Sequence, residues 1–267
     1  MNYSKVALSQ IDHCYPPQVR ILNYPYLNTL LYRLSSKSSY GGEIISLVEN
    51  LYDQFLGLIF SAMLPTHYQQ TPTRMHTSQS PAILNSEIIN SQVPMTLVSL
   101  ARAGIIPSLV AYKKLLQIMA PELVRQDHFS MNRKTNEKQE VIGVDVSSSK
   151  LGPAMNEGMV MVADPMGATG SSTDYVFSHY KQHMDLEGKL QYVAVHLIVT
   201  PEYLKRITAA HPDVHIFALR LDRGLSAPEV LKTPPGTYWD REQGLNSQGY
   251  IVPGAGGLGE ILNNVYV

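Results

Sequence analysis

The sequence predicts an α/β fold in which a mainly parallel sheet is flanked by helices, and three observations support this. Residues 160–163 (VMVA) form an unbroken apolar run, which is typical of a strand covered on both faces. Small, hydroxylated residues follow this run and open a helical pattern. Further on, mainly apolar strand candidates at 192–199 and 214–219 flank a helical pattern at 201–210 that begins with proline. Strands that alternate with helices in this way are the signature of parallel sheets with right-handed crossovers.

The length and charge of the chain limit the kinds of partner that it binds. Its 267 residues are enough for one large domain. We expect a single domain, with an N-terminal helical arm at 1–65, a core sheet at 93–220 and a closing segment at 221–267. The 21 basic and 22 acidic residues leave a net charge of −1, so we expect neither nucleic acid nor a membrane as partner.

Cysteine usage and the apolar runs indicate a compartment. Cys14 is the single cysteine, which excludes an intrachain disulfide and suits a reducing environment. No apolar run approaches the length of a membrane span, and residues 1–17 lack the apolar core of a signal peptide. We therefore expect a cytoplasmic protein.

Two helices are predicted in the N-terminal region. Residues 26–34 carry leucines at helical spacing, and Gly41 and Gly42 separate them from the next element. Residues 44–59 place apolar side chains at steps of three and four before a stop at Pro65. We interpret the resulting stripe as a packing face.

The middle of the chain contains two polar stretches. Residues 66–92 are rich in polar residues and proline, so we expect a loop, with a short hairpin as the alternative. Arg74 and His76 in this stretch could reach a phosphate, although isolated polar residues in loops are more often solvated. Residues 127–139 are charged and would make a poor core, whereas 141–146 return to strand character.

A first turn with binding potential follows the strand predicted at 93–100. Residues 101–104 (ARAG) connect this strand to a helix predicted at 106–119. Arg102 could bind a diphosphate in a bidentate manner, because its guanidinium is planar and carries paired donors. The alternative is an arginine that pairs with a nearby carboxylate.

The second turn, after the strand at 160–163, has the composition of a phosphate site. It contains small and hydroxylated residues: Gly167, Ala168, Thr169, Gly170, Ser171 and Ser172. A loop of this kind at the start of a helix directs backbone N–H groups and the positive end of the helix dipole toward one point. Asp164 could hold a ribose hydroxyl or a magnesium ion. The alternative is an ordinary strand-to-helix turn with a Ser or Thr cap.

One pair of histidines has metal-site spacing. His179 and His183 lie four residues apart on a predicted helix, but Tyr180 stands where the zinc-protease pattern has glutamate, and no third ligand is evident. We interpret this segment as a surface helix.

Four motifs, in order along the chain, resemble those of a known family. DPMGATGSS at 164–172 resembles the phosphoribosyl pyrophosphate (PRPP) loop of type I phosphoribosyltransferases, in particular the DPMLATGGS form of uracil phosphoribosyltransferases. LARAGIIPS at 100–108 resembles LRAGLGM, HPDVHIF at 211–217 resembles the HPDV strand entry, and GYIVPGAG at 249–256 resembles GYIVPGLG. The resemblance implies a type I phosphoribosyltransferase fold with an N-terminal helical arm and a C-terminal hood over the base.

The resemblance also implies site residues and a cofactor. Catalytic roles are implied for Arg102, Asp164 and Arg133, which stands in a stretch that covers the substrate in the family and that otherwise reads as a solvated hairpin tip. The residues implied to bind PRPP are Arg102, Ala103, Gly104, Arg133, Asp164, Pro165, Met166, Gly167, Ala168, Thr169, Gly170, Ser171 and Ser172. Those implied to bind the base are Met166, Ala168, Tyr250, Ile251, Gly254, Ala255 and Gly256. No direct metal motif is present, so Mg²⁺ is expected to arrive with PRPP, with Asp164 as a candidate contact.

The C-terminal region departs from the family pattern. Residues 224–243 form an insertion that could gate the base pocket or make an interface. Gly254, Gly256 and Gly259 satisfy GxGxxG, but the chain that follows is too short for a dinucleotide-binding unit. The family's GDAGDR appears as GGLGEI, so that Gly257 replaces an aspartate and Glu260 a later one.

These features lead to one expected activity and two alternatives. The first is transfer of phosphoribose from PRPP to uracil, giving UMP and pyrophosphate in pyrimidine salvage by a homodimer or larger homo-oligomer. The altered hood and the insertion favour a phosphoribosyltransferase for a different base. The missing aspartate at Gly257 favours a non-catalytic regulatory protein that binds PRPP or a nucleotide.

Overall fold

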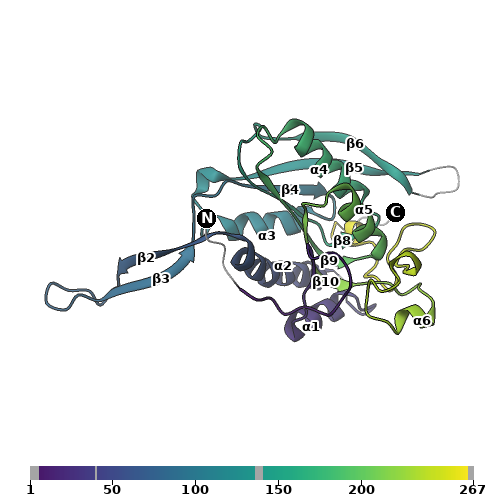
Figure 1. Cartoon of the computed structure of the whole chain (residues 1–267), viewed down its shortest axis with the longest axis horizontal. Helices are drawn as coiled ribbons and strands as arrows, with labels where there is room; N and C mark the ends of the chain where they lie inside the picture. Colours follow the sequence, from purple (N-terminus) through teal and green to yellow (C-terminus); the bar gives the residue numbers. More distant parts are fainter. Residues whose placement is uncertain (1–5, 40, 136–140, 264–267) are drawn as a thin grey trace.

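The computed structural model describes residues 6–39, 41–135 and 141–263 and places one large sheet at their centre (Figure 1). The strand order is β1-β10-β9-β7-β4-β5-β6, and all neighbours are parallel except β6, which runs antiparallel to β5. The strands are β1 (Val19–Ile21), β4 (Met95–Ala101), β5 (Val124–Thr135), β6 (Val141–Lys150), β7 (Gly158–Ala163), β9 (Leu190–Val199) and β10 (His215–Leu221). The predicted α/β class with a mainly parallel sheet is confirmed.

Helices cover both faces of this sheet. One face carries α1 (Pro25–Leu34), α2 (Gly42–Met63) and α3 (Ile105–Leu115), and the other carries α4 (Ser171–His183) and α5 (Pro201–Ala210). Successive residues of β7 point to opposite faces, so Met161 packs in the first cluster and Val160 and Val162 in the second. Burial on both sides explains why this strand is apolar at every position.

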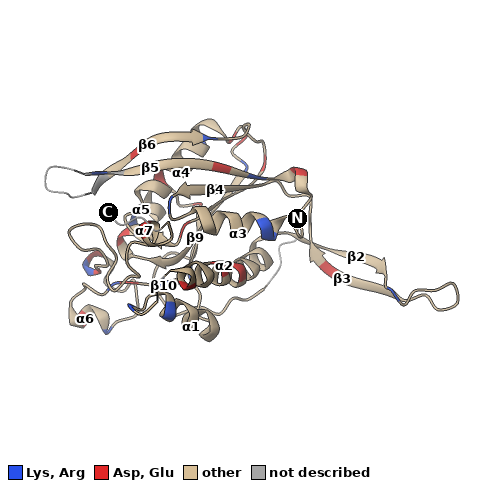
Figure 2. Cartoon of the chain, turned by 180° about the vertical axis from the view of Figure 1, so that it is seen from behind, with Lys and Arg blue, Asp and Glu red and all other residues tan. Residues whose placement is uncertain are grey.

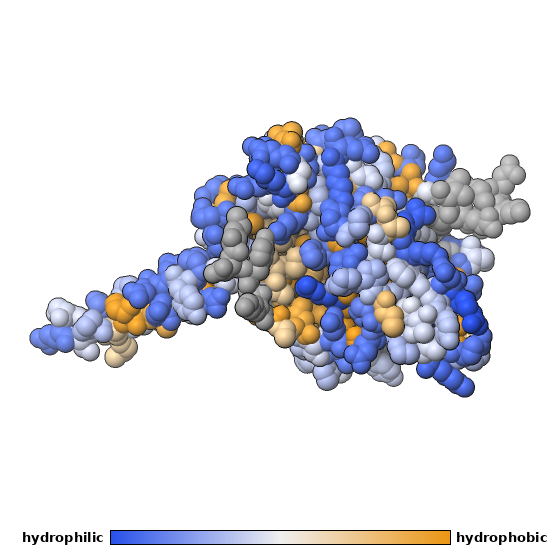
Figure 3. Space-filling model, viewed as in Figure 1, coloured by the Kyte–Doolittle hydropathy of each residue, from blue (hydrophilic) through white to orange (hydrophobic). Residues whose placement is uncertain are grey.

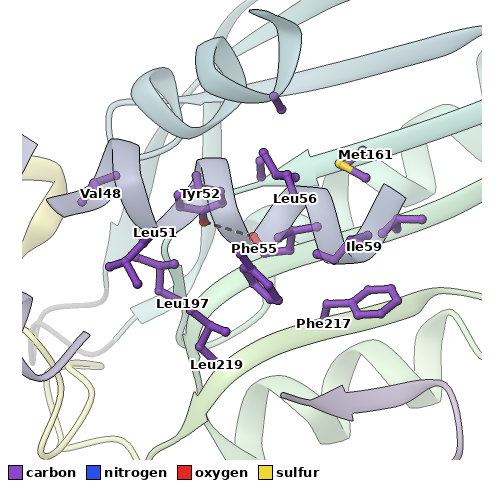
Figure 4. Packing of buried hydrophobic residues seen from close by; sticks show 14 of the residues in the cluster. Val48, Leu51, Tyr52, Phe55, Leu56, Ile59, Met161, Leu197, Phe217 and Leu219 are labelled. Atoms are coloured by element: carbon purple, nitrogen blue, oxygen red, sulfur yellow. Dashed lines mark hydrogen bonds between the residues drawn. The ribbon is translucent and has the colours of Figure 1, made fainter. Parts of the chain in front are cut away.

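The long helix α2 forms the centre of the first cluster. Its apolar stripe lies on the sheet, and Phe55, Leu56 and Ile59 are fully buried (Figure 4). Burying one such side chain contributes roughly 1.5–3 kcal/mol, so the stripe explains why the predicted helix forms. The Tyr52 hydroxyl donates to the Val195 carbonyl oxygen at 3.2 Å and ties the helix to β9.

The polar stretch after α2 is a long β-hairpin rather than a loop. Strands β2 (Thr66–Pro72) and β3 (Ile83–Ile89) pair in antiparallel register and project from the body of the molecule (Figure 1). Both faces of the hairpin meet solvent, so burial imposes no alternation from which the strands could be predicted. Figure 3 shows hydrophobic residues on this hairpin, where Tyr68, Ile83 and Leu84 are exposed.

Strand β5 also runs further than the sequence predicts. It extends to Thr135, into the charged stretch at 127–139, where it pairs with β6, and a buried site satisfies the first acid of that stretch. The Asp127 carboxylate is 1% exposed, accepts from the Gly152 backbone N–H at 2.9 Å and from Arg125 at 3.2 Å, and is also bonded to the Tyr180 hydroxyl. A fully bonded carboxylate can lie in a core that composition alone would exclude.

The insertion at 224–243 is held by a buried ion pair. It contains α6 (Pro228–Leu231) and a short 3₁₀ turn, η2 (Trp239–Arg241). Elsewhere in the chain, another 3₁₀ turn, η1 (Pro121–Leu123), precedes β5. The Glu242 carboxylate accepts from Arg223 at 2.6 Å, from the Gly236 N–H at 2.9 Å and from the Tyr15 hydroxyl. These bonds fix the insertion to the N-terminal segment.

Charged residues of both signs are distributed along the described chain. Ribbon segments coloured for acidic and for basic residues are interspersed in the view of Figure 2, in keeping with the net charge of −1. Across the described residues, no helix is both long enough and apolar enough to cross a bilayer.

Candidate active site

A cavity of about 600 Å³ lies where the carboxyl ends of the central strands meet the C-terminal segment. Strands β4 and β7 are neighbours in the sheet, so the turns that follow them lie side by side. Parallel α/β sheets place their ligand sites at this edge. The cavity is lined by both turns, by β5 and β6, and by residues 249–260 of the C-terminal hood.

The first turn links β4 to α3 and carries Arg102. The Ala101–Arg102 peptide bond is cis, and both residues line the cavity together with Ala103. Gly104 lies behind them: a Cβ there would stand 2.9 Å from the Leu100 backbone and 3.1 Å from the Ala163 carbonyl oxygen. Glycine is therefore required at this position because the first turn folds tightly back on Leu100 and the end of β7 also lies close.

The second turn links β7 to α4. The Asp164 carboxylate accepts from the Met166 N–H at 2.9 Å, and the two-residue strand β8 (Met166–Gly167) pairs with β9. Gly170, with φ 80°, is the N-cap residue of α4 and offers no side-chain cap. The Ser171 N–H makes one long contact with Thr169 Oγ1 at 3.4 Å, and the helix start lies at a cavity lined by residues 168–173.

A series of buried hydrogen bonds, through His196 and Tyr203, holds the backbone of Asp164. His196 of β9 places Nδ1 2.6 Å from the Asp164 carbonyl oxygen and Nε2 2.6 Å from the Tyr203 hydroxyl. Because a carbonyl only accepts, Nδ1 carries the proton and Nε2 accepts from Tyr203. The Tyr203 hydroxyl also bonds to the Thr173 side chain in the first turn of α4. Burial lowers the pKa of His196 to about 4, against a smaller raising effect of the Asp164 carbonyl, so the ring is neutral near pH 7.

The hood is held by a second charged pair. Arg220 donates to the two carboxylate oxygens of Asp222 at 2.6 and 2.8 Å and to the Gly254 carbonyl oxygen at 2.9 Å. The Gly254 N–H in turn donates to Asp222 at 2.7 Å. Gly254 has a φ of 64°, which favours glycine, and follows the cis peptide bond between Val252 and Pro253. The turn that carries the hood is thus fixed to the end of β10.

The structure brings most of the predicted site residues to one cavity. Those that line it are Arg102, Ala103, Asp164, Met166, Ala168, Thr169, Gly170, Ser171, Ser172, Tyr250, Ile251 and Gly256. Gly104, Pro165, Gly167, Gly254 and Ala255 are outside the lining. Gly167 instead packs against Val199 and Tyr203, where a Cβ would come within 2.9 and 3.2 Å of side-chain atoms.

Arg133 is placed only by its backbone. It pairs with Val144 in the β5–β6 ladder, and its side chain is outside the described residues, as are residues 136–140. Neighbouring residues of the two strands, Ser130, Asn132 and Gly143, do line the cavity. No residue of the insertion at 224–243 is among the described lining residues.

The few carboxylates of the cavity suit a cation that binds mainly to the phosphates of a substrate. Asp164 and Glu260 are the acidic residues among the described lining residues. Within the described ranges no three His, Cys, Asp or Glu residues come close enough together to hold a metal. His179 and His183 are therefore not part of such a group. Mg²⁺ commonly keeps several waters and uses one or two carboxylates together with substrate phosphates. Asp164 suits that mode of binding, whereas Glu260 is paired with Arg102.

Comparison with known proteins gives a consistent family and fold. A family model described as uracil phosphoribosyltransferase matches residues 21–241. The uracil phosphoribosyltransferase of Thermococcus kodakarensis is 35% identical over 104 residues, which are 39% of this chain and 35% of the relative. That of Finegoldia magna is 34% identical over 113 residues, or 42% and 43% of the two chains. These matches therefore span less than half of each curated relative.

A solved structure extends the similarity of the fold over nearly the whole chain. The AQ2163 protein from Aquifex aeolicus superposes with a TM-score of 0.67 at 22% identity, covering 93% of this chain and 99% of the other. This likeness concerns the fold alone.

Proposed function

Because the chain belongs to the uracil phosphoribosyltransferase family, which are pentosyltransferases of the type I fold, we propose that it transfers phosphoribose from PRPP to uracil. The products are UMP and pyrophosphate. The observation that carries the proposal is the single cavity lined by the turn at Arg102, the turn at 164–172 and the hood. A sugar phosphate, its diphosphate and a base require three such binding regions within reach of one another.

Each region has chemistry that suits one part of the substrates. The helix start at 168–172 offers N–H groups and hydroxyls for the 5-phosphate, as anion sites at helix termini do. Arg102 offers paired donors to the diphosphate, and Asp164 offers a carboxylate to the ribose hydroxyls. Backbone groups around Ile251 and Gly256 can read the edge of a base, since a wrong base leaves them unpaired.

The reaction needs positioning and charge stabilisation more than proton transfer. The bond from ribose C1 to the diphosphate oxygen breaks, with the electron pair leaving on oxygen, and a nitrogen of the base forms the new bond to C1 and loses its proton to water or to the released diphosphate. Arg102 stabilises the charge that develops on the leaving group, and the two turns and the hood hold the reacting atoms in line. Mg²⁺ bound with PRPP would neutralise further charge on the diphosphate.

We place this activity in pyrimidine salvage in the cytoplasm, carried out by a homodimer or larger homo-oligomer. Light scattering coupled to size-exclusion chromatography measures the oligomeric state: a molar mass of twice or more the 29.7 kDa chain supports this part of the proposal, and the mass of a monomer contradicts it.

A panel of bases tests the activity. The purified protein is incubated with PRPP, Mg²⁺ and each base in turn, pyrophosphate release is followed, and the nucleotide is identified by mass. UMP formation supports the proposal. Product with another base alone supports the second candidate, which the change of hood residues at Gly257 and Glu260 favours. Tight PRPP binding without turnover would instead identify a regulatory protein.

A further inference from the structure

Two oppositely charged side chains face each other across the cavity. Arg102 Nη2 lies 3.4 Å from Glu260 Oε1, although the two residues are 158 positions apart. Both side chains line the cavity and remain 42% and 41% exposed. A single long contact between exposed groups is a weak ion pair, so a stronger ligand of the guanidinium can replace it.

Gly257 makes room for this contact. A Cβ at position 257 would lie 2.6 Å from Glu260 Oε2, so the flexible end of the Glu260 side chain would have to move from its present place. The backbone of Gly257, with φ −80°, is one that alanine also adopts, so the missing side chain serves the carboxylate rather than the backbone. The glycine leaves the space that the carboxylate occupies when it contacts Arg102.

The charges of the cavity make this pair consequential. Arg102 is the one arginine or lysine among the described lining residues. An anion that binds to it must displace the Glu260 carboxylate or accept a negative charge beside it. A phosphate held by the helix start at 168–172 uses backbone N–H groups and hydroxyls and leaves the pair intact.

We propose that Glu260 is a specificity-determining residue that competes with a diphosphate for Arg102. The inference rests on the proposed function, in which Arg102 receives the diphosphate of PRPP. Glu260 lowers the affinity of every ligand that binds to the Arg102 guanidinium. It leaves unchanged the affinity of a sugar monophosphate that binds only to the second turn. The hood, through Glu260, thus sets how much a diphosphate gains from Arg102.

Calorimetric titration without divalent cations tests this with two probes, pyrophosphate and ribose 5-phosphate. In Glu260→Gln we expect pyrophosphate to bind about two- to five-fold more tightly, the range expected for loss of an exposed ion pair, and ribose 5-phosphate to bind as before. Gly257→Ala keeps the charge but moves the carboxylate, so it should shift pyrophosphate affinity in the same direction. Glu229→Gln is the control for net charge, because Glu229 pairs with Arg241 on the surface and does not line the cavity.

The outcomes separate this inference from the proposed activity. Unchanged or weaker pyrophosphate binding in Glu260→Gln overturns the competition, and so does an equal gain for ribose 5-phosphate or for Glu229→Gln. If pyrophosphate affinity rises in Glu260→Gln but not in Gly257→Ala, the effect comes from the charge of Glu260 and not from its contact with Arg102. That result also overturns the competition. If pyrophosphate binding tightens as expected but the wild-type protein forms no UMP, the competition stands and the proposed transfer fails.

Discussion

The imidazole of His196 lies between the Tyr203 hydroxyl and the Asp164 carbonyl oxygen, with each of its nitrogens 2.6 Å from one of these atoms. The ring is almost wholly buried, so both hydrogen bonds form out of contact with water. It holds the backbone at the point where β7 ends and the candidate phosphate turn begins. A protonated ring could no longer accept from the Tyr203 hydroxyl and would place an uncompensated charge in the core.

This arrangement predicts a pH-dependent stability. The pKa of His196 is lowered to about 4 by burial, whereas an unfolded histidine titrates near 6.5, so between these values the unfolded chain binds a proton that the folded chain does not. The stabilisation is complete above pH 6.5 and is lost as pH falls toward 4, by up to about 3 kcal/mol. Urea unfolding from pH 7 to 4.5 measures it. His196→Asn lacks the titrating ring and keeps a donor, so its profile should be flatter; parallel profiles would contradict the assignment.

Close packing of the two turns predicts that Gly104 does not tolerate a methyl group. In Gly104→Ala the new Cβ would meet backbone atoms of Leu100 and Ala163, which cannot rotate away. We expect a loss of about 1–3 kcal/mol in the free energy of unfolding. Gly42→Ala is the matched control, since nothing lies within 4 Å of its Cβ and a helical site favours alanine. Equal stability of Gly104→Ala and the wild type would show that the turns can move apart.

The sequence predicts the central elements because their signals are local. Residues 160–163 are apolar throughout and 192–199 are apolar except for His196, and the small residues after the first run identify a strand-to-helix turn without knowledge of the rest of the fold. Helix α5 is predicted with its observed bounds because a proline begins it and an apolar stripe continues it. Two of the turns with binding potential follow adjacent strands, and that adjacency brings Arg102 and Asp164 to one cavity.

Features that depend on contacts distant in sequence were not predictable. The β2–β3 hairpin has no buried face to produce a pattern, and Asp127 is buried because Tyr180 and Gly152 satisfy it. The support of Asp164 by His196 had one available signal, a lone polar residue inside an apolar strand, but its partner Tyr203 lies on another element. Glycine motifs do not distinguish a glycine that faces a ligand from one, such as Gly167, that permits packing.

The position of Arg102 predicts a selective loss of diphosphate binding. Arg102→Ala removes charge-assisted donors worth about 1.5–3 kcal/mol, so we expect roughly 10- to 100-fold weaker binding of pyrophosphate and PRPP. Ribose 5-phosphate should bind nearly unchanged at the second turn. Arg241→Ala is a control that also removes one arginine, from a surface pair outside the cavity. Unaltered PRPP affinity in Arg102→Ala would remove this arginine from the proposed site.

The buried pair of the insertion predicts a change in stability without a change in chemistry. The Glu242 side chain is completely buried and that of Arg223 is 11% exposed, so Glu242→Ala leaves a buried guanidinium without its carboxylate. Loss of one partner in such a pair costs about 3–5 kcal/mol. Removing the exposed Glu229 in the same way should cost less than about 1 kcal/mol, because its pair with Arg241 is solvated. Chemical denaturation measures both losses.

Pyrophosphate affinity of the folded Glu242→Ala protein should match that of the wild type, since none of the described residues that line the cavity belongs to the insertion. A large fall in affinity at conditions where the variant is folded would show that the insertion contributes to the site after all.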